Sequence, residues 1–146
     1  MSFSGLSIVF VVLLQLAADN PLSPVGWQLK KLGTLKNIPK IVESKRTGDE
    51  VLLVVSNEGD APLLYYGAGT NHIQLFQDTA DGDSWEAARW DWCGTGKEVH
   101  TIEPGKSVHL TVRFWDKVKR ERMLGRFTEK DTKRSGLVVL ATEPTN

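Results

Sequence analysis

Residues 107–115, SVHLTVRFW, contain the pattern that decides the fold. Apolar and polar side chains alternate through this stretch, and the apolar positions are Val108, Leu110, Val112 and Phe114. Because successive side chains of a β-strand point to opposite faces, this period of two predicts a strand with one face in a core. The preceding residues 103–106, EPGK, place proline and then glycine at the centre of a turn, which predicts a type II turn.

The rest of the chain has the same organisation, with short apolar runs separated by turn residues about every ten positions. Further strands are predicted at Lys40 to Ser44, Val51 to Ser56, Leu63 to Tyr66, Ile73 to Gln77, Trp85 to Trp92, Glu98 to Ile102 and Gly136 to Thr142. A short helix at Ser84 to Arg89 competes with one of them, because its residues are helix-permissive. The predicted fold class is all-β, an antiparallel immunoglobulin-like β-sandwich of about seven to nine strands.

Composition excludes several classes of protein. The 146 residues are enough for one domain with its own core, and 18 basic side chains balance 18 acidic ones. A neutral chain has no long-range attraction to nucleic acid, so no nucleic-acid partner is expected. The single cysteine excludes an internal disulfide and any multi-cysteine metal site. We expect no cofactor.

The N-terminal region is strongly apolar from Leu6 to Ala18, LSIVFVVLLQLAA. This length suits the core of a signal peptide and is short of the roughly 20 residues that span a bilayer. Residues 1–5 contain no Lys or Arg, so the positive start of a signal peptide is missing. A retained membrane tether and a strand or helix of the fold remain alternatives.

These observations divide the chain into three parts. Residues 1–18 are predicted to be a signal peptide or N-terminal anchor, residues 19–36 a linker or first strand, and residues 37–146 the sandwich domain. The expected localisation is therefore exported, meaning periplasmic, secreted or membrane-tethered. It is cytoplasmic if residues 1–18 belong to the fold.

Three motifs suggest chemistry, and each has the wrong spacing for it. The glycines of residues 94–98, GTGKE, are too close together for a phosphate loop, and no helix is predicted after them. The carboxylates of residues 78–83, DTADGD, miss the calcium-loop positions, and Asp-Gly favours a hairpin turn. His72, His100 and His109 share no local pair, although a hairpin at Pro104 would bring the last two together. No metal site is predicted.

Cys93 is the one candidate for a reactive thiol. A nucleophilic cysteine needs a base and a lowered pKa, and the nearest cations in sequence are Arg89 and Lys97. No cysteine-enzyme signature surrounds it. We expect a small packing residue here and no catalytic residues in the chain.

The tryptophans are the stronger candidates for a functional surface. Trp85, Trp90 and Trp92 lie within eight positions, and tryptophan is enriched where proteins bind partners. In a regular strand Trp85 points to the opposite face from Trp90 and Trp92, so at least one face carries accessible aromatic surface unless a bulge resets the register. A core position is the alternative for each.

Residues 117–134, KVKRERMLGRFTEKDTKR, contain eight basic and three acidic side chains. Binding to nucleic acid would require interleaved aromatic residues, and only Phe127 is present. This segment is predicted to be a solvated hairpin with edge-protecting lysines.

Three stretches resemble a known group of proteins: residues 56–67 (SNEGDAPLLYYG), 81–99 (DGDSWEAARWDWCGTGKEV) and 102–116 (IEPGKSVHLTVRFWD). Their order, from N-x-G-x-x-P-L-Y through W-C-G-T-G to P-G-x-S, resembles small exported bacterial domains of uncharacterised function. The likeness covers Val51 to Asp116 and implies an immunoglobulin-like sandwich. Parts of it also resemble the intracellular proteinase inhibitor family, from which the chain departs by its WCGTG motif and apolar N-terminus.

The predicted function is a non-enzymatic, exported or envelope-associated module that binds an unknown protein or ligand through loops or exposed tryptophans. A protease-inhibitor-like domain and a Cys93-dependent enzyme are the alternatives from other classes. The oligomeric state does not follow from the sequence.

Overall fold

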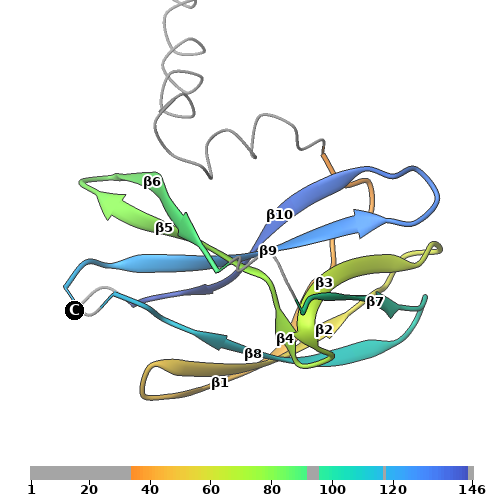
Figure 1. Ribbon diagram of the computed structural model, residues 1–146, viewed down its shortest axis with the longest axis horizontal. Coiled ribbons are helices and arrows are strands. Elements are labelled where there is room, and N and C mark those ends of the chain that lie inside the picture. Colours follow the sequence, from red (N-terminus) through yellow and green to blue (C-terminus); the bar gives the residue numbers. More distant parts are fainter. Residues whose placement is uncertain (1–33, 92–95, 117, 145–146) are drawn as a thin grey trace, which may run out of the picture.

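The computed structural model describes residues 34–91, 96–116 and 118–144, which form two antiparallel β-sheets packed face to face (Figure 1). The smaller sheet has three strands in the order β1-β2-β8. Their bounds are Lys40–Thr47 for β1, Glu50–Ser56 for β2 and Ser107–Arg113 for β8.

The larger sheet has seven strands, and its main path runs β4-β3-β9-β5-β6, with β10 paired to β9 and β7 paired to β3. In chain order these are β3 (Leu63–Gly69), β4 (His72–Ile73), β5 (Leu75–Asp81), β6 (Ser84–Trp90), β7 (Glu98–Ile102), β9 (Glu121–Glu129) and β10 (Ser135–Thr142). The prediction of an all-β, antiparallel sandwich is confirmed, with ten strands among the described residues. The alternative helix at Ser84 to Arg89 is wrong, because these residues belong to β6.

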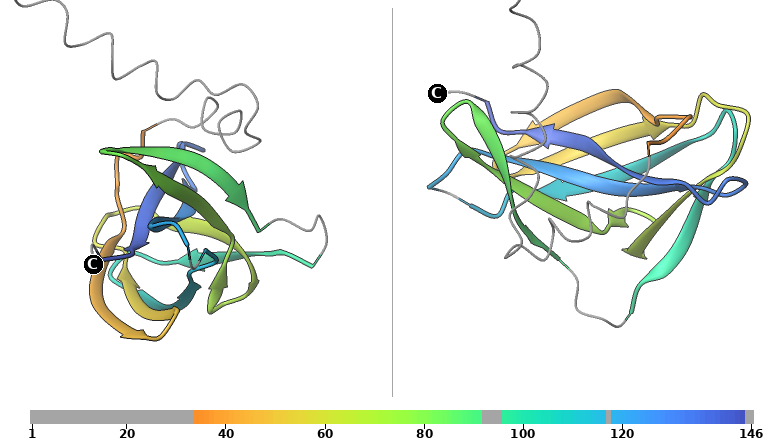
Figure 2. Two further views of the ribbon diagram at one scale, coloured as in Figure 1. Left: turned by 90° about the vertical axis from the view of Figure 1, so that its left-hand side faces the viewer. Right: turned by 90° about the horizontal axis from the view of Figure 1, so that it is seen from above.

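The core lies between the two sheets, and Figure 2 shows β1, β2 and β8 on one side of it with β5, β6 and β10 on the other. The alternation predicted around residue 110 is confirmed: Leu110, Val112 and Phe114 are buried, whereas His109 and Arg113 are exposed. The largest fully buried side chains, Tyr65 and Phe127, come from the larger sheet. Apolar burial on this scale is the main source of stability in such a domain.

β9 is the central strand of the larger sheet, so the prediction of a solvated hairpin at residues 117–134 is wrong. β9 contacts β3 and β5 along one edge and β10 along the other. Its inward side chains include Met123 and Phe127, which are fully buried. The charged residues of this segment had indicated a solvated position, but two of them, Glu121 and Glu129, are buried with hydrogen-bond partners.

Glu129 at the end of β9 fixes the start of the described chain. Its Oε1 accepts hydrogen bonds from the backbone amides of Lys36 and Asn37, at 2.5 and 2.8 Å. Thr132 donates its hydroxyl to Oε2. These bonds, led by that of Thr132, lower the pKa of the Glu129 carboxyl. A buried carboxylate therefore attaches residues 34–39 to the sandwich.

The turn at residues 103–106 has the predicted geometry, but it does not form the hairpin between two paired strands that was expected at Pro104. Gly105 has a φ of 75°, and Lys106 N donates to Glu103 O at 3.0 Å, as the turn requires. The strands on either side do not pair with each other, because β7 pairs with β3 and β8 with β2. The turn therefore carries the chain from one sheet to the other.

No helix long and apolar enough to cross a membrane occurs among the described residues. Residues 1–18, on which the export prediction depends, lie outside them.

Candidate interaction site

A β-bulge in β6 decides where the tryptophans point. Arg89 pairs with Gln77 and Ala87 with Asp78, so Ala88 is an extra residue in β6. Trp90 then pairs with Phe76 and Trp85 with Ala80, which places both tryptophans on the outer face of the larger sheet. The expectation that they lie on opposite faces held only for a regular strand, and this bulge is the exception that was stated with it.

Trp85 is half-buried, and two arginines lie close to its ring. The guanidinium carbons of Arg120 and Arg122 are 5.1 and 4.9 Å from its ring centroid. Arg122 is also held by Asp78, with Nε and Nη2 both 2.7 Å from Oδ2. Cation–π attraction of this kind keeps a partly exposed indole in one orientation.

Trp90 belongs to a second, smaller apolar cluster on the same face. Its ring meets Phe76 edge to face at 6.1 Å between centroids. Phe76 and Leu124 are buried in this cluster, and Ala87 and Leu137 pack against them. Trp90 itself is half-buried, so it contributes to packing and keeps some exposed area.

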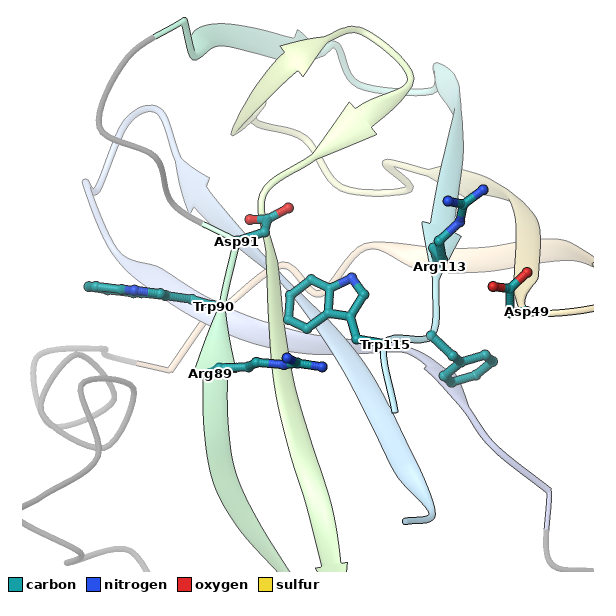
Figure 3. A pocket seen from close by; sticks show the side chains of 7 residues that line it. Asp49, Arg89, Trp90, Asp91, Arg113 and Trp115 are labelled. Carbon is teal, nitrogen blue, oxygen red and sulfur yellow. The ribbon is translucent and has the colours of Figure 1, made fainter. Parts of the chain in front are cut away.

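A pocket of about 500 Å³ opens where β6 and β8 end, as Figure 3 shows. Trp115 lies at the centre of this pocket. Trp90 is at the edge of the pocket, and its indole points away from Trp115 on the far side of β6. The lining residues are Asp49, Arg89, Trp90, Asp91, Arg113, Phe114 and Trp115. The volume is in the range of small-molecule and side-chain binding sites, and the rim carries charges of both signs.

The indole of Trp115 is supported from two directions. It packs against the main core on one side, and the guanidinium carbon of Arg89 lies 5.2 Å from its ring centroid. Arg89 Nε donates to Gln77 Oε1 at 2.7 Å, and Gln77 in turn donates to the buried carboxylate of Glu121. Glu121 also accepts the Asp116 amide at 2.9 Å. These linked hydrogen bonds hold the Arg89 side chain in one position. Arg89 in turn restricts the orientation of the Trp115 indole.

The rest of the rim is ordered by ion pairs and backbone contacts. Asp91 Oδ1 accepts the Leu75 amide at 2.8 Å and lies 3.3 Å from Lys97 Nζ. Arg113 pairs with Glu50 at 2.5 Å, and this hydrogen bond raises the pKa of the guanidinium. The charges that face the pocket therefore have defined positions before any ligand arrives.

Asp116, next to Trp115, caps the following turn. Its Oδ1 accepts the amides of Val118 and Lys119 at 2.8 and 3.2 Å. These two bonds lower the pKa of the Asp116 carboxyl, and the nearby charge of Arg89 adds to the effect. Asp116 is therefore ionised at neutral pH, and its role is to order the turn.

Two of the four predicted site residues, Trp92 and Cys93, lie outside the described residues. The reactive-thiol hypothesis therefore stays a prediction, as does a contact role for Trp92. Gly96, at the end of the glycine pair, has a φ of 77°, a backbone conformation that favours glycine. The following Glu98 begins a strand, β7.

The histidines do not come together. His100 pairs with Tyr65 across β7 and β3 and stacks on its ring at 5.2 Å, whereas His109 pairs with Val54. The prediction of a hairpin that brings His100 next to His109 is therefore wrong. Within the three described ranges, no three His, Cys, Asp or Glu side chains are grouped so that they can hold a metal ion.

Residues 78–83 form the end of β5 and its turn into β6. Gly82 has a φ of 58°, and Ser84 Oγ donates to Asp81 O at 2.8 Å. Asp78 lies in the strand, paired with Arg122, away from the turn. The hairpin prediction is confirmed.

The sequence missed the pocket around Trp115. The alternation in residues 107–115 placed Trp115 with the solvent-facing residues, but β8 ends at Arg113, two residues before Trp115. Trp115 and Arg89 lie 26 positions apart, and only the packing of the sheets brings them together. A tryptophan two residues beyond the end of a strand was the one local signal.

Comparison with protein families and with curated proteins adds no relative. No protein-family model matches the chain, and no curated protein matches it either. The resemblance of residues 51–116 to small exported immunoglobulin-like domains therefore stays a prediction.

Proposed function

We propose that this protein is a non-enzymatic, exported or envelope-associated β-sandwich module that binds a polypeptide segment of a protein partner in the Trp115 pocket. The observation that carries the proposal is the pocket itself. It is open, has an indole at its centre and has two arginines and two aspartates around it. Trp and Arg are the residues that most often dominate the energetics of protein interfaces.

The chemistry of the pocket favours a peptide over a simple ion. A cluster of one sign would select a charged ligand, but Arg89 and Arg113 are matched by Asp49 and Asp91. The indole offers a flat apolar surface for one side chain, and the charged rim offers donors and acceptors for the backbone on either side of it. Because the contacts of Arg89 and Asp91 already fix the rim, little ordering entropy is lost on binding.

Selection from a displayed library of random peptides, with the full-length protein as bait, tests the proposal. We expect enriched peptides with an aromatic or large aliphatic anchor. Arg113→Ala is expected to weaken their binding about tenfold or more, because it removes a rim charge without touching the core. Lys106→Ala, an exposed cation in the turn between the sheets, is the matched control and should bind as the unmodified protein does.

Binding that is equal in the Arg113→Ala variant and in the control would place the peptide elsewhere and overturn the proposal. A selection that enriches no peptide would also count against it. Urea unfolding of both variants verifies that a loss of binding is not a loss of fold.

A further inference from the structure

Among the described residues, β1 is an edge strand with one unpaired side. It is eight residues long and pairs only with β2 among the described residues. Nearly all of its side chains are exposed, including Val42 at 45%. An edge strand presents a row of unpaired backbone donors and acceptors, to which another strand can add.

The register identifies the peptide groups that point outward. Asn57 N donates to Lys106 O and Phe114 N donates to Asp49 O, both at 2.9 Å, so the odd-numbered residues of β2 direct their peptide groups toward β8. Its even-numbered residues therefore bond to β1. Ser44 pairs with the odd-numbered Leu53, so the N–H and C=O of Ser44 point away from the sheet.

The side chains beside Ser44 are self-complementary. Glu43 and Lys45 are both exposed, and neither forms an ion pair with another residue of the described ranges. If two copies of β1 pair antiparallel about Ser44, Glu43 of each copy lies opposite Lys45 of the other. Opposite charges directly across an antiparallel pair stabilise it, and the two-fold symmetry provides this contact twice.

A groove runs beside the same positions. It has a volume of about 230 Å³ and is lined by Glu43, Ser44, Lys45, Leu52, Leu53 and Val54. Leu52 is 51% exposed although it sits in the middle of β2. Lys45 and Glu43 are the cross-strand neighbours of Leu52 and Val54, so a second β1 at this edge would extend the sheet next to exposed apolar surface.

We propose that β1 is a homodimerisation edge, at which two copies of this chain pair antiparallel about Ser44 to form one continuous six-stranded sheet from the two small sheets. The bulge at Val42 confines regular pairing to the residues around Ser44. An interface of this size is small, so the dimer is weak and depends on concentration.

Sedimentation or light scattering of the full-length chain, over an about hundred-fold range of concentration, measures the association. The mass is expected to rise from 16.2 kDa toward twice that value. Glu43→Lys places like charges opposite each other at both contacts and should weaken the dimer about tenfold. The double variant Glu43→Lys/Lys45→Glu exchanges the charges and should restore it.

Ser44→Pro tests the backbone contact separately. Proline removes an outward N–H that β2 does not use, so the fold should survive while the dimer is lost. Ser44→Ala keeps the N–H and is the matched control. Urea unfolding of every variant verifies the fold.

Three outcomes would overturn the proposal. The chain could remain a monomer throughout the concentration range. Its association could be unaffected by both Glu43→Lys and Ser44→Pro, which would locate the contact elsewhere. The charge exchange could fail to restore an association that Glu43→Lys had weakened.

Discussion

β9 and β1 carry the same number of charged side chains and have opposite places in the molecule. Each has four, in the sequences ERMLGRFTE and KIVESKRT. β9 is the buried centre of the larger sheet, whereas β1 is the exposed edge of the smaller one. The difference lies in burial: Glu121 and Glu129 of β9 are buried and hydrogen-bonded, whereas all four charged side chains of β1 are exposed.

In β9 three of the four charged side chains, Glu121, Arg122 and Glu129, are matched by specific contacts, whereas Arg126 Nε is buried without a partner among the described residues. Glu121 accepts the Asp116 amide and a Gln77 amide hydrogen, and Arg122 pairs with Asp78. In β1, exposed Lys40 and Arg46 pair with Glu58 and Glu143, and Glu43 and Lys45 form no ion pair within the described residues. Buried polar groups are tolerated only where hydrogen bonds satisfy them, so the number of charges does not reveal whether a strand is central or peripheral.

The largest expected effect is the loss of stability on truncating a buried apolar side chain of β9, compared with an exposed one of β1. Phe127 of β9 is fully buried, and Phe127→Ala should lower the free energy of unfolding by about 3–5 kcal/mol. Val42 of β1 is 45% exposed, and Val42→Ala should change the free energy of unfolding by less than about 0.5 kcal/mol. Urea unfolding measures both, and similar losses would contradict the assigned places of the two strands.

A smaller effect is expected from adding a methyl group to the centre of β9. A Cβ atom at Gly125 would lie 2.7 Å from Ile73 Cδ1 and 2.8 Å from Leu140 Cδ1. Both atoms are the ends of flexible side chains that can shift, so Gly125→Ala should cost about 1 kcal/mol through overpacking. Gly69→Ala is the control, because no heavy atom lies within 4 Å of its added carbon. If thermal unfolding shows both variants equally stable, β9 is less tightly packed than described.

The smallest of the three effects concerns Glu129 and depends on pH. Its folded-state pKa is lowered, so the carboxylate contributes stability above the unfolded pKa of about 4.3 and loses it as pH falls through the folded value. Glu129→Gln should therefore unfold more easily than the unmodified protein at pH 7, with a difference that shrinks in acid. Glu86→Gln, at an exposed position of β6, is the control and should show no such trend. A difference that is constant from neutral to acidic pH would contradict the stabilising role of the Glu129 carboxylate.

Local patterns in the sequence predicted local features of the fold correctly. The alternation around Leu110, the turn at Pro104 and the hairpin at Gly82 depend on residues close together in the chain, and all three are present. The fold class followed from the repetition of such patterns.

The errors concern features that depend on distant residues or on one inserted position. The charges of β9 indicated a solvated hairpin because their partners, such as Gln77 and Asp78, lie more than 40 positions away. The bulge at Ala88 places Trp85 on the same face as Trp90, and no residue type at this position indicates a bulge. The pocket at Trp115 depends on the end of β8 meeting the end of β6, which the sequence does not specify.

Amide hydrogen exchange in dilute protein tests the contrast between β9 and β1 most directly. The amides of Met123 to Phe127 should exchange most slowly, because β9 is paired on both edges and opens only with the whole domain. In β1 the Glu43 and Lys45 amides, which bond to β2, should be protected, while that of Ser44 should exchange rapidly. Exchange in β9 as fast as at Ser44 would contradict the central position of β9 and with it this account of the fold.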